Sequence, residues 1–385
     1  MKYNDLDHNQ NNGVKTMKFN AGKPALMHAI NAVQKAVSPR SPLPVLTGIL
    51  FEVTGNRLYL TGSDTELTIQ CNIEVETETE GAIVLPIRYI SDLVRSLPDI
   101  PIQFNSIPGS TSVIITYGTS QVSIHGYEPE QYPRLPSINR GTGIQVPQDE
   151  LKEMLRQVLF AVSNDETRPV FTGVLMQVDG KQFRLVATDT YRLAMKNYQL
   201  EEEIEQPVRA IIPGKTLGEV ARLTGNTEEK ISIILEENHA FFSTADLKIA
   251  SRLIAGQYPP YEQVIPREFV TRTRVTTREI MDATERASLL ARDGYPVVKF
   301  TLQENSCVVS VQTQAGWIRE EISGLVEGEP LEIWFNARYM SESLRALNSD
   351  ELCLELTGPL SAAVLRPAGD DSYLSLLLPA KPPKD

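Results

Sequence analysis

The chain has 385 residues and a formal net charge of −12 at pH 7, and this length predicts two or three domains that can each bury a core. It contains no run of about 18 apolar residues that could span a membrane, and its first residues are polar where a signal peptide would be apolar. We therefore expect a cytoplasmic protein. The acidic charge argues against broad nonspecific nucleic-acid binding unless basic groups gather in one place.

Cysteine and histidine are too few and too scattered to indicate a metal centre or a disulfide framework. Cys71, Cys307 and Cys353 lack CxxC spacing and are expected to be buried apolar residues. The four histidines lie far apart in the sequence, which leaves little material for a metal cluster or a Ser-His-Asp triad. We therefore expect no metal, no cofactor and no catalytic centre.

Taken in chain order, one succession of predicted elements occurs three times. It comprises an amphipathic helix, a strand rich in Val, Ile, Leu and Phe, a second strand and a second helical pattern. These elements lie at 24–37, 43–53, 63–69 and 84–97, at 149–162, 168–178, 188–195 and 211–224, and at 278–291, 295–305, 314–322 and 334–347.

A unit of about 125 residues is too long for a solenoid repeat, so each copy is predicted to be a whole domain. The predicted fold class is α+β, with helices covering one face of antiparallel sheet in each of three tandem domains. We place the three repeats at 17–139, 140–267 and 268–385. Residues 1–16 are expected to form an N-terminal extension without ordered structure.

Basic residues recur at matching positions of the second helical pattern. Two positions seven residues apart are separated by about 20° around a helix axis, so both lie on one face. The matching residues are Arg88, Lys215 and Arg338, and then Arg95, Arg222 and Arg345. Further basic residues near or on the first helices are Lys35, Arg40, Lys152, Arg156, Arg278 and Arg286. A solubilising role would explain one such helix, but recurrence in three diverged copies of an acidic protein favours a binding surface.

Acidic residues are segregated from these helices. The segment 74–81 alternates glutamates on one face of a predicted strand, and 200–206 and 327–332 hold corresponding positions. Such charges also protect a sheet edge from aggregation. The chain shows no helix-turn-helix, zinc finger or aromatic RNA-binding motif, so we expect salt-sensitive contact with the DNA backbone and no base reading.

Several segments resemble a known family, the bacterial sliding clamp, which is the β subunit of the replicative DNA polymerase III. They are "MKFNAGKPALMHAINAVQKAVSPRSPLPVLTGILFEV", "LVATDTYRLAM" and "SRLIAGQYPPYEQVIP", and the resemblance extends from Met17 to about Lys381. It implies a processivity factor without catalytic activity, built as a head-to-tail homodimer whose six domains close a ring around duplex DNA. It also implies helices lining the hole and sheets forming the rim.

The resemblance further implies a groove between the second and third domains that binds hydrophobic peptides of the polymerase α subunit, the clamp loader, and repair and translesion proteins. By matching segments, the groove residues are Arg168, Val170, Thr188, Thr190, Arg192, Leu193, Pro259, Val264, Leu376, Leu378 and Pro379. The family often has glycine where Thr190 stands, so its methyl group is expected to narrow the groove floor. Ala380 and Lys381 replace a larger apolar residue and an arginine, which affects the expected peptide preference.

Three other interpretations fit parts of the sequence. Asp64 and Asp189, in "SDT" and "TDT", could form a catalytic pair, but capping of a turn is the favoured role because the third copy has Gly316 there. Gly-Lys-Thr at 214–216 is an incomplete phosphate-binding loop, because Arg209 stands where the first glycine is needed. A triplicated scaffold that binds only proteins is the alternative function.

Overall fold

The computed structural model describes residues 16–138, 141–291 and 296–382. They form two compact units, unit 1 with residues up to 138 and 239–252, and unit 2 with the remainder. Residues 1–15 of the predicted extension lie outside the described residues. Segment 239–252, which we placed in the second repeat, packs with unit 1 because β15 pairs with β4. The three domain boundaries given above stay a prediction.

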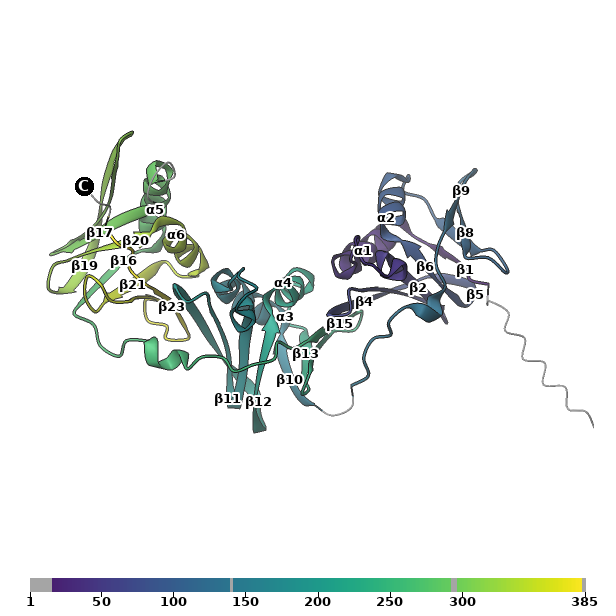
Figure 1. Ribbon diagram of the computed structural model, residues 1–385, viewed down its shortest axis with the longest axis horizontal. Helices are drawn as coiled ribbons and strands as arrows, with labels where there is room; N and C mark the ends of the chain where they lie inside the picture. Colours follow the sequence, from purple (N-terminus) through teal and green to yellow (C-terminus); the bar gives the residue numbers. More distant parts are fainter. Residues whose placement is uncertain (1–15, 139–140, 292–295, 383–385) are drawn as a thin grey trace, which may run out of the picture. The chain divides into compact units, whose positions relative to one another are not determined.

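Unit 1 places two helices against antiparallel strands (Figure 1). The elements are β1 (Lys18–Ala21), α1 (Lys23–Val33), β2 (Gly48–Thr54), β3 (Arg57–Ser63), β4 (Leu67–Glu74), β5 (Glu76–Thr79), β6 (Gly81–Pro86), α2 (Ile87–Ser96), β7 (Ile102–Ser106), β8 (Ser112–Tyr117), β9 (Ser120–His125), β14 (His239–Ser243) and β15 (Leu247–Arg252). One sheet has the order β5-β1-β7-β8-β9, and a second runs β14-β15-β4-β3-β2-β6. Helix α1 packs on β3 and β4 and beside α2.

The predicted acidic strand lies at a sheet edge. Residues 74–81 form the end of β4, the whole of β5 and the start of β6, and β5 is the outermost strand of its sheet. Glu74, Glu76, Glu78 and Glu80 are all exposed. These carboxylates discourage another chain from pairing with the edge.

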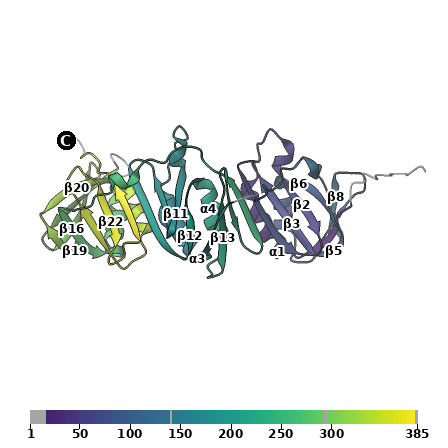
Figure 2. The same cartoon turned by 90° about the horizontal axis from the view of Figure 1, so that it is seen from below.

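In its described residues, unit 2 contains four α-helices, one long antiparallel sheet and the antiparallel pair β10–β13. Its elements are β10 (Thr142–Pro147), α3 (Gln148–Val158), β11 (Gly173–Thr188), β12 (Arg192–Pro213), α4 (Gly214–Leu223), β13 (Lys230–Leu235), β16 (Thr271–Thr276), α5 (Thr277–Ala291), β17 (Val297–Gln303), β18 (Ser306–Thr313), β19 (Gly316–Gly328), β20 (Leu331–Asn336), α6 (Ala337–Ala346), β21 (Glu351–Leu356), β22 (Ala363–Pro367) and β23 (Tyr373–Leu377). The order of the long sheet is β11-β12-β23-β22-β21-β16-β19-β18-β17-β20, so the second and third repeats share it (Figure 2).

Two of the predicted first strands begin later than expected. Residues Pro44–Thr47 and Pro169–Thr172 form single turns of 3₁₀ helix, and the strands start at the glycine that follows. The threonine hydroxyl of each turn donates to the carbonyl of its proline, at 2.7 Å for Thr47 and 2.8 Å for Thr172. Proline fixes φ near the helical value and has no N–H to donate to a sheet, so Pro-x-x-Thr-Gly begins with a turn.

The predicted second strands at 63–69 and 188–195 are wrong in their centres. Strand β3 ends at Ser63 and β4 starts at Leu67, while β11 ends at Thr188 and β12 starts at Arg192. Both segments are therefore tight turns between paired strands. The two candidate catalytic aspartates cap these turns: Asp64 Oδ1 accepts from the amides of Glu66 and Leu67, and Asp189 makes the equivalent contacts one repeat later.

The helix starts follow local chemistry. In α6, the side chain of Asn336 accepts from the amides of Arg338 and Tyr339 and caps the first turn. The Gly-Lys-Thr segment is the first turn of α4, where Thr216 is buried.

Cys71 and Cys307 are buried as expected, whereas Cys353 is only half-buried. In the described part of the chain, no helix is long and apolar enough to cross a membrane.

Candidate nucleic-acid interface and partner site

The helices that carry the predicted DNA-facing residues pack in pairs. Helix α1 contacts α2, α3 contacts α4, and α5 contacts α6, so each repeat presents a two-helix layer. Of the twelve basic residues named in the sequence analysis, eleven are exposed and Lys152 is half-buried. The exposed residues are Lys35, Arg40, Arg88, Arg95, Arg156, Lys215, Arg222, Arg278, Arg286, Arg338 and Arg345.

At the second of the two repeated basic positions, the arginine has a carboxylate partner in every copy. The sequence analysis did not predict these ion pairs. Arg95 pairs with Asp92 at 3.2 Å and Arg222 pairs with Glu219 at 2.6 Å, in each case three residues earlier. In the third repeat, Arg345 pairs instead with Glu285 of α5 at 2.8 Å. Exposed pairs of this kind contribute about 0–1 kcal/mol each, so a phosphate can displace the carboxylate at little cost.

Three of the predicted DNA-facing residues brace the protein itself. Arg156 donates to the carbonyl oxygens of Arg345 at 2.9 Å and Ala346 at 3.1 Å, which ties α3 to the end of α6. Arg286 forms an ion pair with Glu320 of β19, and Lys152 donates to the side chain of Asn226 at 2.9 Å. Their charges remain near the helical layer, but their side chains have structural partners that the sequence pattern did not reveal.

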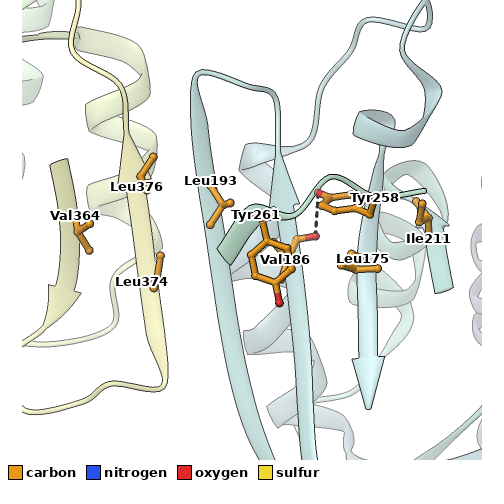
Figure 3. Packing of buried hydrophobic residues seen from close by; sticks show 9 residues of the cluster. All are labelled: Leu175, Val186, Leu193, Ile211, Tyr258, Tyr261, Val364, Leu374 and Leu376. Carbon is orange, nitrogen blue, oxygen red and sulfur yellow. Dashed lines mark hydrogen bonds between the residues drawn. The ribbon is translucent and has the colours of Figure 1, made fainter. Parts of the chain in front are cut away.

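The segments of the predicted partner site converge where β12 meets β23. Their register pairs Leu193 with Leu376, which brings "TDTYRL" beside "LSLLLP". A cluster of buried side chains lies at this junction (Figure 3). Its members are Leu175, Val186, Leu193, Ile211, Tyr258, Tyr261, Val364, Leu374 and Leu376, with Val170 packed against them. The structure thus brings together three of the predicted residues, Val170, Leu193 and Leu376.

Several exposed apolar residues are close in sequence to members of this cluster. Val264 is 57% exposed at the end of a 3₁₀ turn, Tyr261–Val264, that contributes Tyr261 to the cluster. Leu378 is 44% exposed, and its amide donates to the carbonyl of Tyr191 at 2.9 Å. Tyr191 is also exposed and was not among the predicted residues. Exposed apolar groups next to a buried cluster are what a peptide anchor requires.

The remaining predicted groove residues differ in exposure. Thr188 is buried, Pro259 and Pro379 are half-buried, and Arg168 is exposed, with an ion pair to Asp165 at 3.3 Å. Arg168 also lies over the ring of Phe171, 5.4 Å from its centre.

The turn from Thr188 to Arg192 is held by its own side chains. Asp189 Oδ1 accepts from the amides of Tyr191 at 2.9 Å and Arg192 at 3.0 Å. Thr188 Oγ1 accepts from the amide of Thr190 and donates to the carbonyl of Arg192. These bonds hold Thr190 at φ 79°, a left-handed conformation that β-branched residues disfavour. Thr65 has φ 77° in the matching turn of the first repeat.

Replacing Thr190 with glycine should stabilise the protein slightly. Left-handed backbone costs an L-residue about 1–2 kcal/mol, which glycine would avoid. Glycine also gives the unfolded chain more conformational freedom, which offsets roughly 0.4–1 kcal/mol of this stabilisation. We expect Thr190→Gly to raise the free energy of unfolding by up to about 1 kcal/mol in urea titration. Thr190→Ala keeps the Cβ and its strain, so it serves as the control. A glycine variant no more stable than the alanine variant would show that the turn is not strained.

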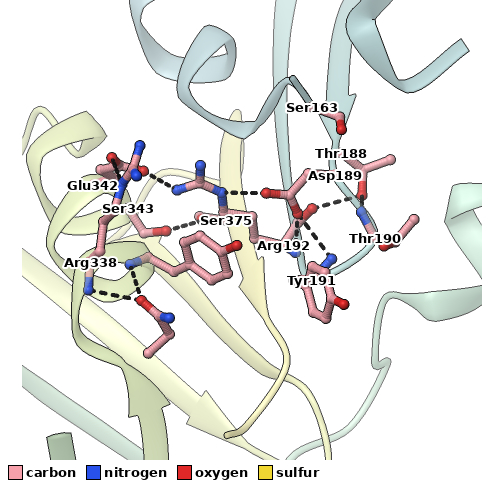
Figure 4. A network of polar contacts seen from close by, with 12 residues as sticks. Ser163, Thr188, Asp189, Thr190, Tyr191, Arg192, Arg338, Glu342, Ser343 and Ser375 are labelled. Carbon is pink, nitrogen blue, oxygen red and sulfur yellow. Dashed lines mark hydrogen bonds and ion pairs between the residues drawn. The ribbon is translucent and has the colours of Figure 1, made fainter. Parts of the chain in front are cut away.

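Arg192 is buried, although we predicted it to line the groove. Its side chain is 6% exposed, and Nε donates to Asp189 Oδ2 at 3.0 Å while Nη1 donates to Glu342 of α6 (Figure 4). Its guanidinium also lies over the rings of Tyr339 and Phe160. Arg192 therefore anchors the turn of the second repeat to the first turns of α6.

The electrostatics of this network favour the charged state of Glu342. Burial pushes the pKa of Glu342 upward, but hydrogen bonds from Arg338 and Arg192 outweigh it and leave the pKa below the ordinary glutamate value. A lowered carboxyl pKa means that the stabilisation is complete at neutral pH and is lost as the pH falls through that lowered pKa. The network is therefore intact under neutral conditions.

Comparison with known proteins identifies the class. Sequence models of the N-terminal, central and C-terminal domains of the DNA polymerase III beta subunit match residues 17–136, 145–260 and 262–381. The beta sliding clamps of Staphylococcus epidermidis and Staphylococcus aureus are each 35% identical, over 95% of this chain and 99% of theirs.

Solved structures agree with the sequence relatives. The DNA polymerase sliding clamp from Bacillus subtilis has a TM-score of 0.91 at 33% identity and covers 95% of this chain and 99% of its own. The beta subunit from Thermotoga maritima has a TM-score of 0.88 at 27% identity, over 95% and 100%. Three tandem domains of antiparallel sheet with paired helices define a DNA clamp.

The chain belongs to the bacterial DNA polymerase III β subunit family, the beta sliding clamps. This family supplies a non-catalytic subunit of the polymerase, and the chain has the role of a processivity clamp in DNA replication.

Proposed function

We propose that the chain forms a head-to-tail homodimer that closes around duplex DNA, slides on it through nonspecific phosphate contacts and tethers its partners by hydrophobic peptides. The observation that carries this proposal is the exposed arginine at one helical position of all three repeats, Arg95, Arg222 and Arg345, in a chain of charge −12. An acidic surface repels the phosphate backbone elsewhere, so DNA is accepted only along the basic helices.

The basic side chains on the helices suit sliding because their ion pairs within the protein are weak. Exposed arginines with carboxylate neighbours can exchange one weak partner for another, and contacts to phosphate read no sequence. The predicted residues Lys35, Arg40, Arg88, Lys215 and Arg338 would add to this surface. Topological enclosure then allows weak contacts to hold a polymerase on its template.

The partner site is proposed at the β12–β23 junction. Exposed Leu378, Val264 and Tyr191 around the buried cluster suit a short apolar segment. We propose as its ligands peptides of the replicative polymerase α subunit, the clamp loader, and repair and translesion proteins.

Retention on circular and linear DNA tests the proposal against a scaffold that binds only proteins. The chain is loaded by a bacterial clamp loader onto a nicked circular plasmid, half of which is then linearised, and both are separated from free protein by gel filtration. An encircling clamp stays on the circle and runs off the linear ends. Equal retention on both, or on neither, contradicts encirclement, and a native mass of one chain at micromolar concentration would contradict the dimer.

A further inference from the structure

One carboxylate, that of Glu342, joins the two proposed surfaces. Its Oε1 accepts from Nε of Arg338 at 2.8 Å, and its Oε2 accepts from Nη1 of Arg192 (Figure 4). The side chain of Arg338 is 74% exposed, on the helix face that we assign to DNA, whereas that of Arg192 is 6% exposed. A surface charge and a buried charge therefore share one partner.

The buried arginine depends on that partner. Arg192 has Asp189 and Glu342 as its acidic partners in ion pairs of the described structure, and both carboxylates are largely withdrawn from water. Removing one partner of a buried ion pair leaves an incompletely compensated charge and is strongly unfavourable. The exposed Arg338 loses little by exchanging Glu342 for another anion. When a second anion competes for Arg338, Glu342 stays with Arg192.

Arg192 transmits this preference to the turn of the partner site. Its Nε holds the side chain of Asp189, whose other oxygen caps the amides of Tyr191 and Arg192. Tyr191 also contacts the ring of Tyr339, one residue from Arg338, with ring centres 6.3 Å apart. A stronger ion pair between Glu342 and Arg192 therefore stabilises the backbone of this turn. That backbone carries the exposed Tyr191, whose carbonyl accepts from the Leu378 amide.

We propose that Glu342 is a positioning residue that couples the two surfaces: a phosphate that engages Arg338 leaves the carboxylate to Arg192 alone, and the turn then binds a partner peptide more tightly. This proposal rests on the proposed function of both surfaces. Coupling between two sites is reciprocal, so a bound peptide also frees Arg338 for DNA. The clamp would hold its partners more firmly when it is on DNA.

Two variants in the full-length chain test the coupling. Arg338→Ala removes the competitor for Glu342, and it should tighten binding of a fluorescein-labelled peptide from a polymerase α subunit by about threefold to tenfold. Glu342→Gln removes the charge that holds Arg192, and it should weaken binding by about tenfold. Arg319→Ala is the matched control, because Arg319 is an exposed arginine of β19 with its own carboxylate partner, Glu321, and neither residue was assigned to either surface.

A variant with both substitutions, Arg338→Ala and Glu342→Gln, distinguishes coupling from two independent local effects. If Arg338 acts through Glu342, Arg338→Ala adds nothing once Glu342→Gln is present, and the two effects fail to add. A short duplex should tighten the peptide on wild type by a similar factor and leave Arg338→Ala unchanged. Equal peptide affinities of wild type, Arg338→Ala and Arg319→Ala would overturn the proposal.

Failure of the partner site itself is seen separately. A wild-type chain that binds no peptide removes the proposed peptide site before any variant is compared. Hydrogen exchange at the amides of Tyr191, Arg192 and Leu378 then decides the coupling without a peptide. Faster exchange in Glu342→Gln and slower exchange in Arg338→Ala support it, and unchanged exchange in both overturns it.

Discussion

Reversing the charge of Arg95, Arg222 and Arg345 to glutamate is expected to weaken loading of the clamp onto circular DNA, and so to lower the amount retained at moderate salt. Two unit charges about 4 Å apart interact by about 1 kcal/mol in water, and each reversal replaces an attraction with a repulsion. Three positions therefore weaken the contact by about 3–6 kcal/mol before screening, a loss of roughly a hundredfold or more. The measurement is retention on nicked plasmid across a salt series, whose slope should also become shallower.

A matched triple variant controls for net charge. Arg57, Arg252 and Arg319 are exposed, each has a carboxylate partner, and all lie on strands, β3, β15 and β19. Their reversal to glutamate changes the net charge by the same amount without touching the helices. If this control loses retention as completely as the helix variant, the helical positions have no special role.

Replacing Leu193 and Leu378 together with alanine is expected to abolish binding of polymerase-derived peptides. Leu378 is an exposed apolar anchor, and such anchors contribute about 2 kcal/mol or more, while loss of the buried Leu193 side chain disturbs the junction itself, so the pair should weaken binding by roughly a thousandfold. Leu193 belongs to the buried cluster, and its truncation also lowers the free energy of unfolding by about 2–5 kcal/mol. Leu378 is 44% exposed, so Leu378→Ala alone should weaken the peptide while the thermal midpoint stays close to wild type.

Peptide affinity is measured by fluorescence anisotropy, with circular dichroism to confirm folding. Leu360→Ala is the control, because this leucine is 79% exposed and was not assigned to either surface. Wild-type affinity in the folded double variant would remove the β12–β23 junction as the partner site.

Periodicity in the sequence predicted the six helices and the α+β class because helical faces and apolar runs are local patterns. Each of the six predicted helices overlaps an observed one, from α1 at Lys23–Val33 to α6 at Ala337–Ala346. The turns inside "SDTEL" and "TDTYRL" were missed because β-branched threonine favours strands, while the side chains of Asp64 and Asp189 impose the turn. The ability of aspartate to cap a turn was the signal in the sequence that could have located these turns. Capping was the role favoured for Asp64 and Asp189, although both were placed within strands.

The partners of the arginines were harder to foresee. Asp92 and Glu219 lie three residues before Arg95 and Arg222, a spacing that indicates a helical ion pair and could have been found in the sequence. No local pattern connects Arg192 with Glu342, because 150 residues separate them and they meet through tertiary contacts such as the pairing of β12 with β23. The burial of Arg192 follows from that long-range contact.

Strand β12 has a mechanical consequence. It runs without interruption for 22 residues from Arg192 to Pro213, and α4 with Lys215 and Arg222 begins at the next residue. Antiparallel bonds to β11 flank most of its length, with β23 on the other side at its start. A pull along the axis of β12 must shear many of these bonds at once instead of opening them one by one, so the sheet resists a load applied along this strand.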